Sequence, residues 1–164
     1  MLSFLRVEKA VARLAGWVNA VAAAAVVCIM LLVTADVILR YFRRPIPGVY
    51  DAVGMLGAAV IAFALPYTTL KKGHIAVDVL VRKLPWIGRV TVNVVNTLVS
   101  LALFGLLTWQ SVLYAQDLKA SGVVSPTVQM PTYPFVYGVA VGSALLCVVL
   151  LVELIRQFRG AEIE

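Results

Sequence analysis

Long apolar runs alternate with short polar segments along the chain, and this pattern predicts four membrane-spanning helices. The runs cover about residues 14–39, 51–70, 87–114 and 135–155. A helix of about 20 apolar residues is long enough to cross the roughly 30 Å hydrocarbon layer of a bilayer. The first run exceeds that length, so we expect it to tilt or to project into the headgroups. The sequence therefore predicts an all-α integral membrane protein with a single membrane domain over residues 1–164.

Two shorter segments, residues 1–13 and 74–84, mix charged and apolar residues at helical spacing. A helix over the first segment has its basic side chains on one side, and in the second Asp78 and Arg82 are four residues apart. Helices of this kind lie in the membrane interface with the apolar face toward the lipid. We expect both segments to be membrane-surface helices. The residues expected at the membrane surface are Arg13, Lys71, Lys72, His74, Asp78, Arg82 and Lys83.

Composition agrees with lipid as the main solvent of the chain. Apolar residues make up 62% of the sequence and charged residues 13%, whereas soluble domains carry about 25% charged residues. The net charge of +6 is compatible with nucleic-acid binding, but the basic residues lie between the apolar runs. That distribution is typical of membrane topology, so no nucleic-acid partner is expected. Cys28 and Cys147 lie deep inside apolar runs, where we expect them to act as small packing residues.

The distribution of basic residues predicts the orientation of the chain. With four spans, ten of the fourteen Lys and Arg residues fall on the side of the N-terminus. Cytoplasmic loops carry the excess of Lys and Arg in membrane proteins, so both ends of the chain are expected in the cytoplasm. The opposite side carries Arg40, Arg43 and Arg44 in its first loop and Lys119 near its second. Topology does not explain these three arginines.

The sequence offers little catalytic chemistry. Its single histidine, His74, excludes a haem held by two histidines of this chain and a metal site with several histidines. Because no Ser/His/Asp set, phosphate-binding loop or pair of intramembrane carboxylates is visible, we expect no enzyme activity and no cofactor. Asp36 is the one ionisable candidate inside a span, one turn before Arg40. It either pairs with Arg40 at the helix end, contacts a partner subunit, or relays protons, for which a second carboxylate at membrane depth is missing.

Small and polar residues at helical spacing indicate helix contacts. Gly138 and Gly142 form a G-x-x-x-G motif in the fourth run, and Gly54, Ala58 and Ala62 repeat small residues in the second. Small residues let helix backbones approach closely in lipid, and polar side chains hydrogen-bond between helices. The pattern leaves open whether these contacts form within the chain or with another protein. The contact candidates are Asp36, Arg40, Asp51, Gly54, Ala58, Ala62, Asn93, Asn96, Ser100, Gly138 and Gly142.

Four local motifs, in order along nearly the whole chain, resemble one family. They are Arg40-Tyr41-Phe42…Pro45-Ile46-Pro47 followed by Asp51, then Lys71-Lys72-Gly73-His74-Ile75-Ala76-Val77-Asp78, then Trp109, then Ser125-Pro126, Pro131 and Tyr137. The chain is similar to the small membrane subunit (DctQ type) of tripartite ATP-independent periplasmic (TRAP) transporters. It departs from many members at Gly48-Val49-Tyr50-Asp51, where they carry a tryptophan and often two acids.

The resemblance implies a role without catalysis in the bacterial inner membrane. Such a subunit pairs with a large multi-span, elevator-type subunit that binds substrate and sodium, while a periplasmic binding protein captures an organic acid. The small subunit enlarges the static scaffold and helps to dock the binding protein, and membrane lipids surround it. Candidates for docking are Arg43, Arg44 and Lys119. The alternatives are a self-sufficient, homodimeric, proton-coupled exporter, which would need Asp36, and a membrane enzyme or haem subunit, which the single histidine opposes.

Overall fold

The computed structural model describes residues 2–71, 86–127 and 129–161. This part of the chain forms four long helices, α1 (Leu2–Tyr41), α2 (Val49–Leu70), α4 (Trp86–Ser121) and α5 (Tyr133–Ala161). Each of the four is long and apolar enough to cross a membrane. The all-helical, four-span prediction is therefore confirmed.

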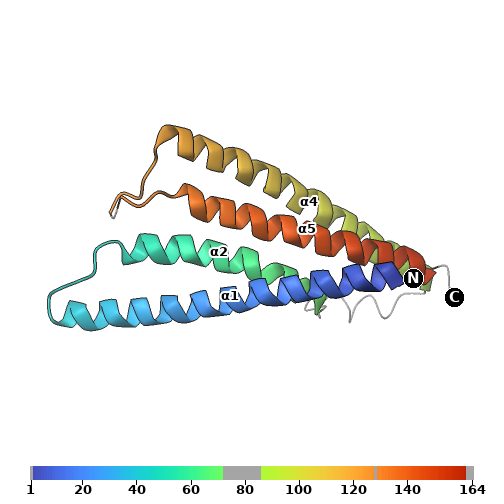
Figure 1. Ribbon diagram of the computed structural model, residues 1–164, viewed down its shortest axis with the longest axis horizontal. Helices are drawn as coiled ribbons and strands as arrows, with labels where there is room; N and C mark the ends of the chain where they lie inside the picture. Colours follow the sequence, from blue (N-terminus) through green and yellow to red (C-terminus); the bar gives the residue numbers. More distant parts are fainter. Residues whose placement is uncertain (1, 72–85, 128, 162–164) are drawn as a thin grey trace.

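The helices form a row in the order α1, α2, α5, α4 (Figure 1). α5 packs against α2 on one side and α4 on the other, α1 packs against α2, and α1 touches α5 only slightly. Among the described helices, α4 packs against α5 alone. Four helices in a row leave both faces of the row without cover from the other described helices, unlike a closed four-helix bundle.

The helices converge where α1 begins and α5 ends, and they spread toward the other end (Figure 1). At the converging end, Arg156 Nη1 of α5 lies 4.0 Å from Glu8 Oε1 of α1. The other end carries the connections over residues 42–48 and 122–132, and we call it the loop end. The start of α1 and the end of α5 thus lie on one side of the row. That this side is cytoplasmic stays a prediction.

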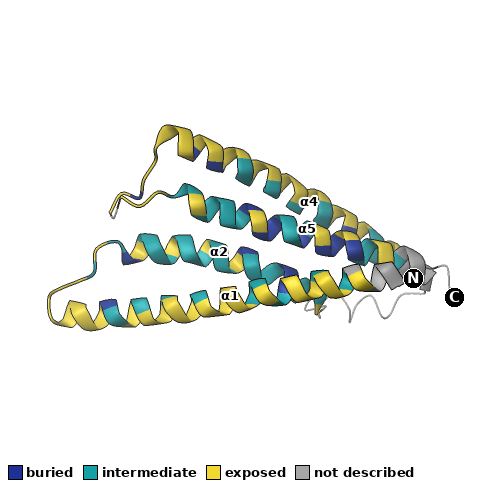
Figure 2. Cartoon of the chain, viewed as in Figure 1, coloured by how far each residue is buried: buried dark blue, intermediate teal, exposed yellow. Residues whose placement is uncertain are grey.

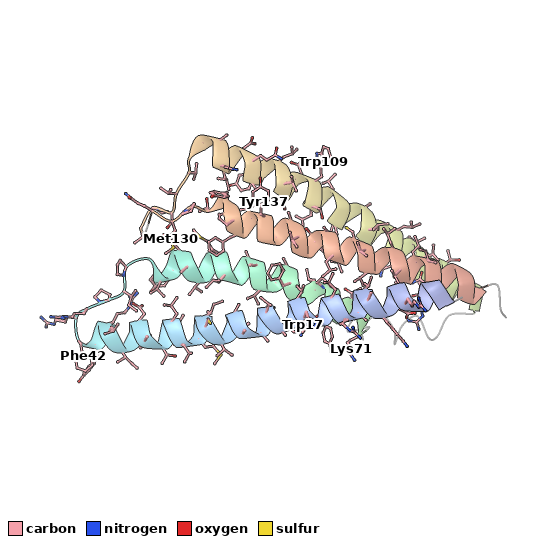
Figure 3. All side chains as sticks on the ribbon, in the orientation of Figure 1. Trp17, Phe42, Lys71, Trp109, Met130 and Tyr137 are labelled. Atoms are coloured by element: carbon pink, nitrogen blue, oxygen red, sulfur yellow. The ribbon has the colours of Figure 1, made fainter. Side chains whose placement is uncertain are left out.

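Burial identifies α5 as the centre of the row (Figure 2). Of its most apolar stretch 39% is buried, against 6% for α4. Trp109 projects from α4 on the side away from α5 (Figure 3), and Trp17 of α1 is also largely exposed. Much of the apolar surface of the outer helices must therefore meet lipid or another protein. The buried residues of α5 are Ala140, Gly142, Ser143, Leu146, Val149, Leu150 and Val152.

The two predicted surface helices have different outcomes. Residues 2–13 are helical, but they continue without a break into the span, so α1 is one helix of 40 residues. Their placement on the membrane surface stays a prediction, and Arg13 within them is exposed. The segment 74–84 lies outside the described residues, as does Lys72. Lys71, at the end of α2, is exposed, and its ammonium lies 5.7 Å from the centre of the Tyr67 ring.

The third helix runs further than the apolar run that predicted it. It ends at Ser121 rather than near Tyr114 because the polar residues after Tyr114 continue the helix. Gly122, in the left-handed backbone region with φ 63°, follows the helix, and the Val123 amide donates a hydrogen bond to the Leu118 carbonyl at 3.2 Å. This is the six-to-one bond of a Schellman turn, which commonly ends a helix at a glycine.

Candidate partner interface

Asp36 connects the end of α1 to the loop over residues 42–48. The guanidinium Nε of Arg40 donates to Asp36 Oδ2 at 2.7 Å, which is the pair expected from their spacing. The backbone amide of Ile46 donates to Asp36 Oδ1 at 2.9 Å. The Asp36 side chain is 6% exposed and the Arg40 side chain 44%. One carboxylate therefore holds both the end of α1 and the loop beyond it. The spacing of residues indicated the contact with Arg40 but not the contact with Ile46.

Arg40 also connects α1 to α2. Its guanidinium carbon lies 5.2 Å from the centre of the Tyr50 ring, in the first turn of α2. Cations within about 6 Å of an aromatic ring are attracted to its face. The ends of α1 and α2 and the loop between them are thus tied by side chains from both helices.

Asp51 has the corresponding role for the loop over residues 122–132. The hydroxyl of Ser125 donates to Asp51 Oδ2, and the amide of Thr127 donates to the same oxygen at 3.3 Å. Ser125 is 1% exposed, so its hydroxyl depends on this partner. The loop itself folds back on Ser125, whose amide donates to the Met130 carbonyl at 2.9 Å and whose carbonyl accepts from the Gln129 amide at 3.0 Å. The loop is therefore a compact turn fixed to the start of α2.

A hollow of about 460 Å³ opens at the loop end between α2 and α4, with α5 also lining it. Tyr50 and Gly54 of α2 and Tyr114 of α4 line it, and Val136 comes from α5. Its surface is mainly apolar, and its polar groups include Asp51 and Ser125, which are bonded to each other. This hollow therefore has the composition of a contact surface for apolar groups.

The G-x-x-x-G motif of α5 packs within the chain. Gly142 lies against the backbone of Ala62 in α2, and a Cβ added at Gly138 would meet Phe63 and Ala59 at 3.7 and 3.9 Å. Gly54 and Ala58, from the small-residue series of α2, are exposed, and the space beside Gly54 is open. The series is thus divided: Ala62 serves the contact with α5, while Gly54 and Ala58 remain on the surface.

The polar face of α4 is divided in the same way. Thr97 is buried, donates to the Asn93 carbonyl at 2.9 Å and accepts from Gln157 Nε2 of α5 at 3.2 Å. Asn93 and Ser100 are half-buried, and Asn96 is exposed. Sequence reasoning missed Gln157, which lies beyond the predicted fourth span. Gln157 lies only two residues beyond that span, so a continued helix would have placed it near the facing polar residues of α4.

The basic candidates at the loop end are all exposed. Arg43 and Arg44 follow α1, and Lys119 lies in the last turn of α4. Within the described residues, none of the three forms an ion pair. Their charges are therefore available to a partner or to headgroups.

The described residues contain no group of three or more His, Cys, Asp or Glu side chains that could hold a metal ion. Cys28 and Cys147 are free thiols on different helices. The described carboxylates Asp36 and Asp51 hold loops. These features define a multi-pass helical membrane protein whose described polar groups stabilise helix ends, loops and helix contacts.

A match to a protein-family model identifies the family within this class. Residues 29–160 match the family described as "Tripartite ATP-independent periplasmic transporters, DctQ component". The chain belongs to this family and is a small membrane component of a TRAP transporter, as its motifs indicated. Comparison with curated proteins gives no match, and neither does comparison with solved structures.

Proposed function

We propose that this chain is a non-catalytic subunit that scaffolds the large, elevator-type membrane subunit of its transporter. In this role it also helps to dock a periplasmic substrate-binding protein during sodium-coupled uptake of an organic acid. The complex lies in the bacterial inner membrane, with both ends of the chain in the cytoplasm. The observation that carries the proposal, together with family membership, is the open row of helices.

The row supports scaffolding because it exposes far more apolar helix surface than its own packing uses. α4 is covered by α5 alone among the described helices, and only 6% of its most apolar stretch is buried. Exposed small residues such as Gly54 and Ala58 allow a foreign helix backbone to approach closely. A membrane-fixed apolar surface of this kind suits the support of a moving transport domain.

Fixed loops at one end support docking. Asp36 and Asp51 each hold one of the two described connections against the helices. Such loops present exposed side chains, Arg43 and Arg44 among them, in a defined arrangement. Electrostatic complementarity mainly speeds encounter and selects partners, which suits repeated docking of a soluble protein.

The exporter alternative receives no support from Asp36. That exporter would need a carboxylate that exchanges protons against substrate, yet both oxygens of Asp36 are hydrogen-bonded, one to Arg40 and one to Ile46. A carboxylate held in this way serves structure.

Copurification tests the proposal. The tagged chain is expressed with a candidate large subunit and a candidate binding protein, and the membrane complex is isolated and reconstituted into liposomes. We expect the chain to copurify with the large subunit in a fixed ratio, and uptake to require both membrane subunits, the binding protein and a sodium gradient. A chain that purifies as a homodimer and transports by itself with a proton gradient would refute the proposal.

A further inference from the structure

Two helices of this chain end in the same backbone turn but carry different residues at its left-handed position. After α1, the Arg44 amide donates to the Leu39 carbonyl and the Arg43 amide to the Arg40 carbonyl, both at 2.9 Å. These are the two hydrogen bonds of a Schellman turn. Arg43 has φ 59° there, and at the equivalent position after α4 Gly122 has φ 63°.

Glycine is the favoured residue at this position because it has no Cβ to clash in the left-handed conformation. Arg43 bears that steric cost, and it is not one of the short polar residues that tolerate the conformation best. A residue held in an unfavourable backbone region points to a function for its side chain. Since Gly122 shows the ordinary solution in the same chain, we look for that function in the charge of Arg43.

The loop around Arg43 is fixed on both sides. Asp36 accepts hydrogen bonds from Arg40 before it and from the Ile46 amide after it. Pro45 and Pro47 restrict the backbone further. Because Asp36 already pairs with Arg40, the charges of Arg43 and Arg44 are left without an acidic partner in the described part of the chain. The result is a pair of exposed arginines on a rigid support.

We propose that Arg43 and Arg44 form a preformed docking surface for carboxylates on a folded, soluble protein partner, with Asp36 as the residue that positions them. This inference rests on the proposed function, in which that partner is the periplasmic binding protein. A planar guanidinium binds a carboxylate through two parallel hydrogen bonds when the geometry is fixed. Prior ordering of the loop lowers the cost of such binding.

Rigidity favours a protein partner over lipid. Phospholipid headgroups are fluid and rearrange around an arginine in any loop conformation, so they give no advantage to a fixed backbone. A folded protein presents carboxylates at fixed positions, so it binds more tightly to arginines that a fixed backbone holds in place. Tyr41 and Phe42, directly before Arg43, are exposed as well, and Figure 3 shows Phe42 beside the end of α1 at the loop end. Aromatic residues and arginine are enriched in protein interfaces.

The test measures association of the purified binding protein with the complete membrane complex in nanodiscs, at low and high salt. Arg43→Gly is the decisive variant because it removes the charge while placing the favoured residue in the turn. Arg43→Lys retains the charge, Arg44→Ala removes the second one, and Lys9→Ala changes an exposed charge near the converging end as a control. Each complex is prepared in zwitterionic and in anionic lipid.

We expect Arg43→Gly and Arg44→Ala each to slow association about tenfold at low salt, with a smaller effect at high salt. Arg43→Lys keeps the charge and should retain most of the wild-type association rate, but it loses the second hydrogen bond to a carboxylate and should dissociate faster than wild type. Lys9→Ala should leave both rates unchanged. The Arg43→Gly complex should unfold at the same or a higher temperature than wild type, which separates lost charge from damaged structure. The result should be the same in both lipids.

Wild-type association of Arg43→Gly and Arg44→Ala would overturn this inference and leave the scaffold function intact. An effect seen only in anionic lipid would also overturn it, because the arginines would then bind headgroups. A wild-type chain that does not copurify with the large subunit would instead refute the proposed function on which the inference rests.

Discussion

Gly142 of α5 lies directly against the backbone of Ala62 in α2. A Cβ added at Gly142 would stand 2.6 Å from the Ala62 carbonyl oxygen and 2.9 Å from its Cβ. Real Cβ atoms do not approach so closely, so one of the two helices would have to move. At this point the contact between α2 and α5 depends on the absence of a side chain.

Gly142→Ala should therefore destabilise the protein. The added Cβ would clash with backbone atoms, which cannot turn aside as a side chain can, so the cost lies in the upper part of the range of about 1–3 kcal/mol for overpacking. This cost exceeds the gain in helix propensity of about 1 kcal/mol. The measurement is thermal unfolding of the purified chain in detergent. Gly138→Ala is the matched control because its nearest neighbours would be at 3.7 Å or more, so it should be neutral or slightly stabilising. Equal stability of the two variants would contradict the described contact.

Asp51→Ala should release the loop over residues 122–132. The substitution leaves the buried Ser125 hydroxyl without its acceptor, and an unsatisfied buried polar group costs about 1–3 kcal/mol. Limited proteolysis should cut this loop faster in the variant than in wild type. Asp117→Ala, which changes an exposed acid of α4, should leave the rate unchanged. A loop that is cut equally slowly in all three proteins would rule out Asp51 as its anchor.

Substitutions of Asp36 should separate its two bonds. Asp36→Asn retains an oxygen for the Ile46 amide but loses the charge pair with Arg40, whereas Asp36→Ala loses both. Hydrogen exchange of the Ile46 amide should be fastest in the alanine variant and intermediate in the asparagine variant. Thr34→Val, two residues earlier, changes a hydroxyl that bonds the Met30 carbonyl and should leave this exchange as in wild type. Slow exchange of Ile46 in Asp36→Ala would show that the prolines alone fix the loop.

Cysteine labelling should determine the side of the membrane on which the loop end lies. In a chain with both native cysteines replaced, Arg43→Cys should react with an impermeant maleimide added outside intact spheroplasts. Lys71→Cys, at the end of α2, should react only after permeabilisation, since the two ends of a span face opposite sides. The reverse pattern would overturn the orientation predicted from the basic residues.

The features that the sequence predicted are those with a local signal. Span number follows from apolar length, and the pair of Asp36 and Arg40 follows from a spacing of one helical turn. The contact between Asp51 and Ser125 joins residues 74 positions apart, and it depends on α5 lying between α2 and α4. No periodicity encodes that order, so the sequence indicated Asp51 only as a contact candidate.

Two further features could be predicted from the sequence only in part or not at all. The G-x-x-x-G motif indicated a close helix contact at Gly142, but its partner Ala62 depends on the order of helices in the row. The left-handed conformation of Arg43 was not predicted because the residue type argues against it: a glycine there would have signalled the turn, as Gly122 does.

The position of α5 has a consequence for how the protein is made. A ribosome completes α1, α2 and α4 before α5, yet among the described helices α4 has no neighbour except α5. The nascent chain therefore holds one associated helix pair and one solitary helix in the membrane, with a vacancy between them that only the next helix fills. Insertion of α5 is the step that converts two separate pieces into one folded unit. A chain truncated before Tyr133 should therefore be degraded faster in the membrane than the full chain.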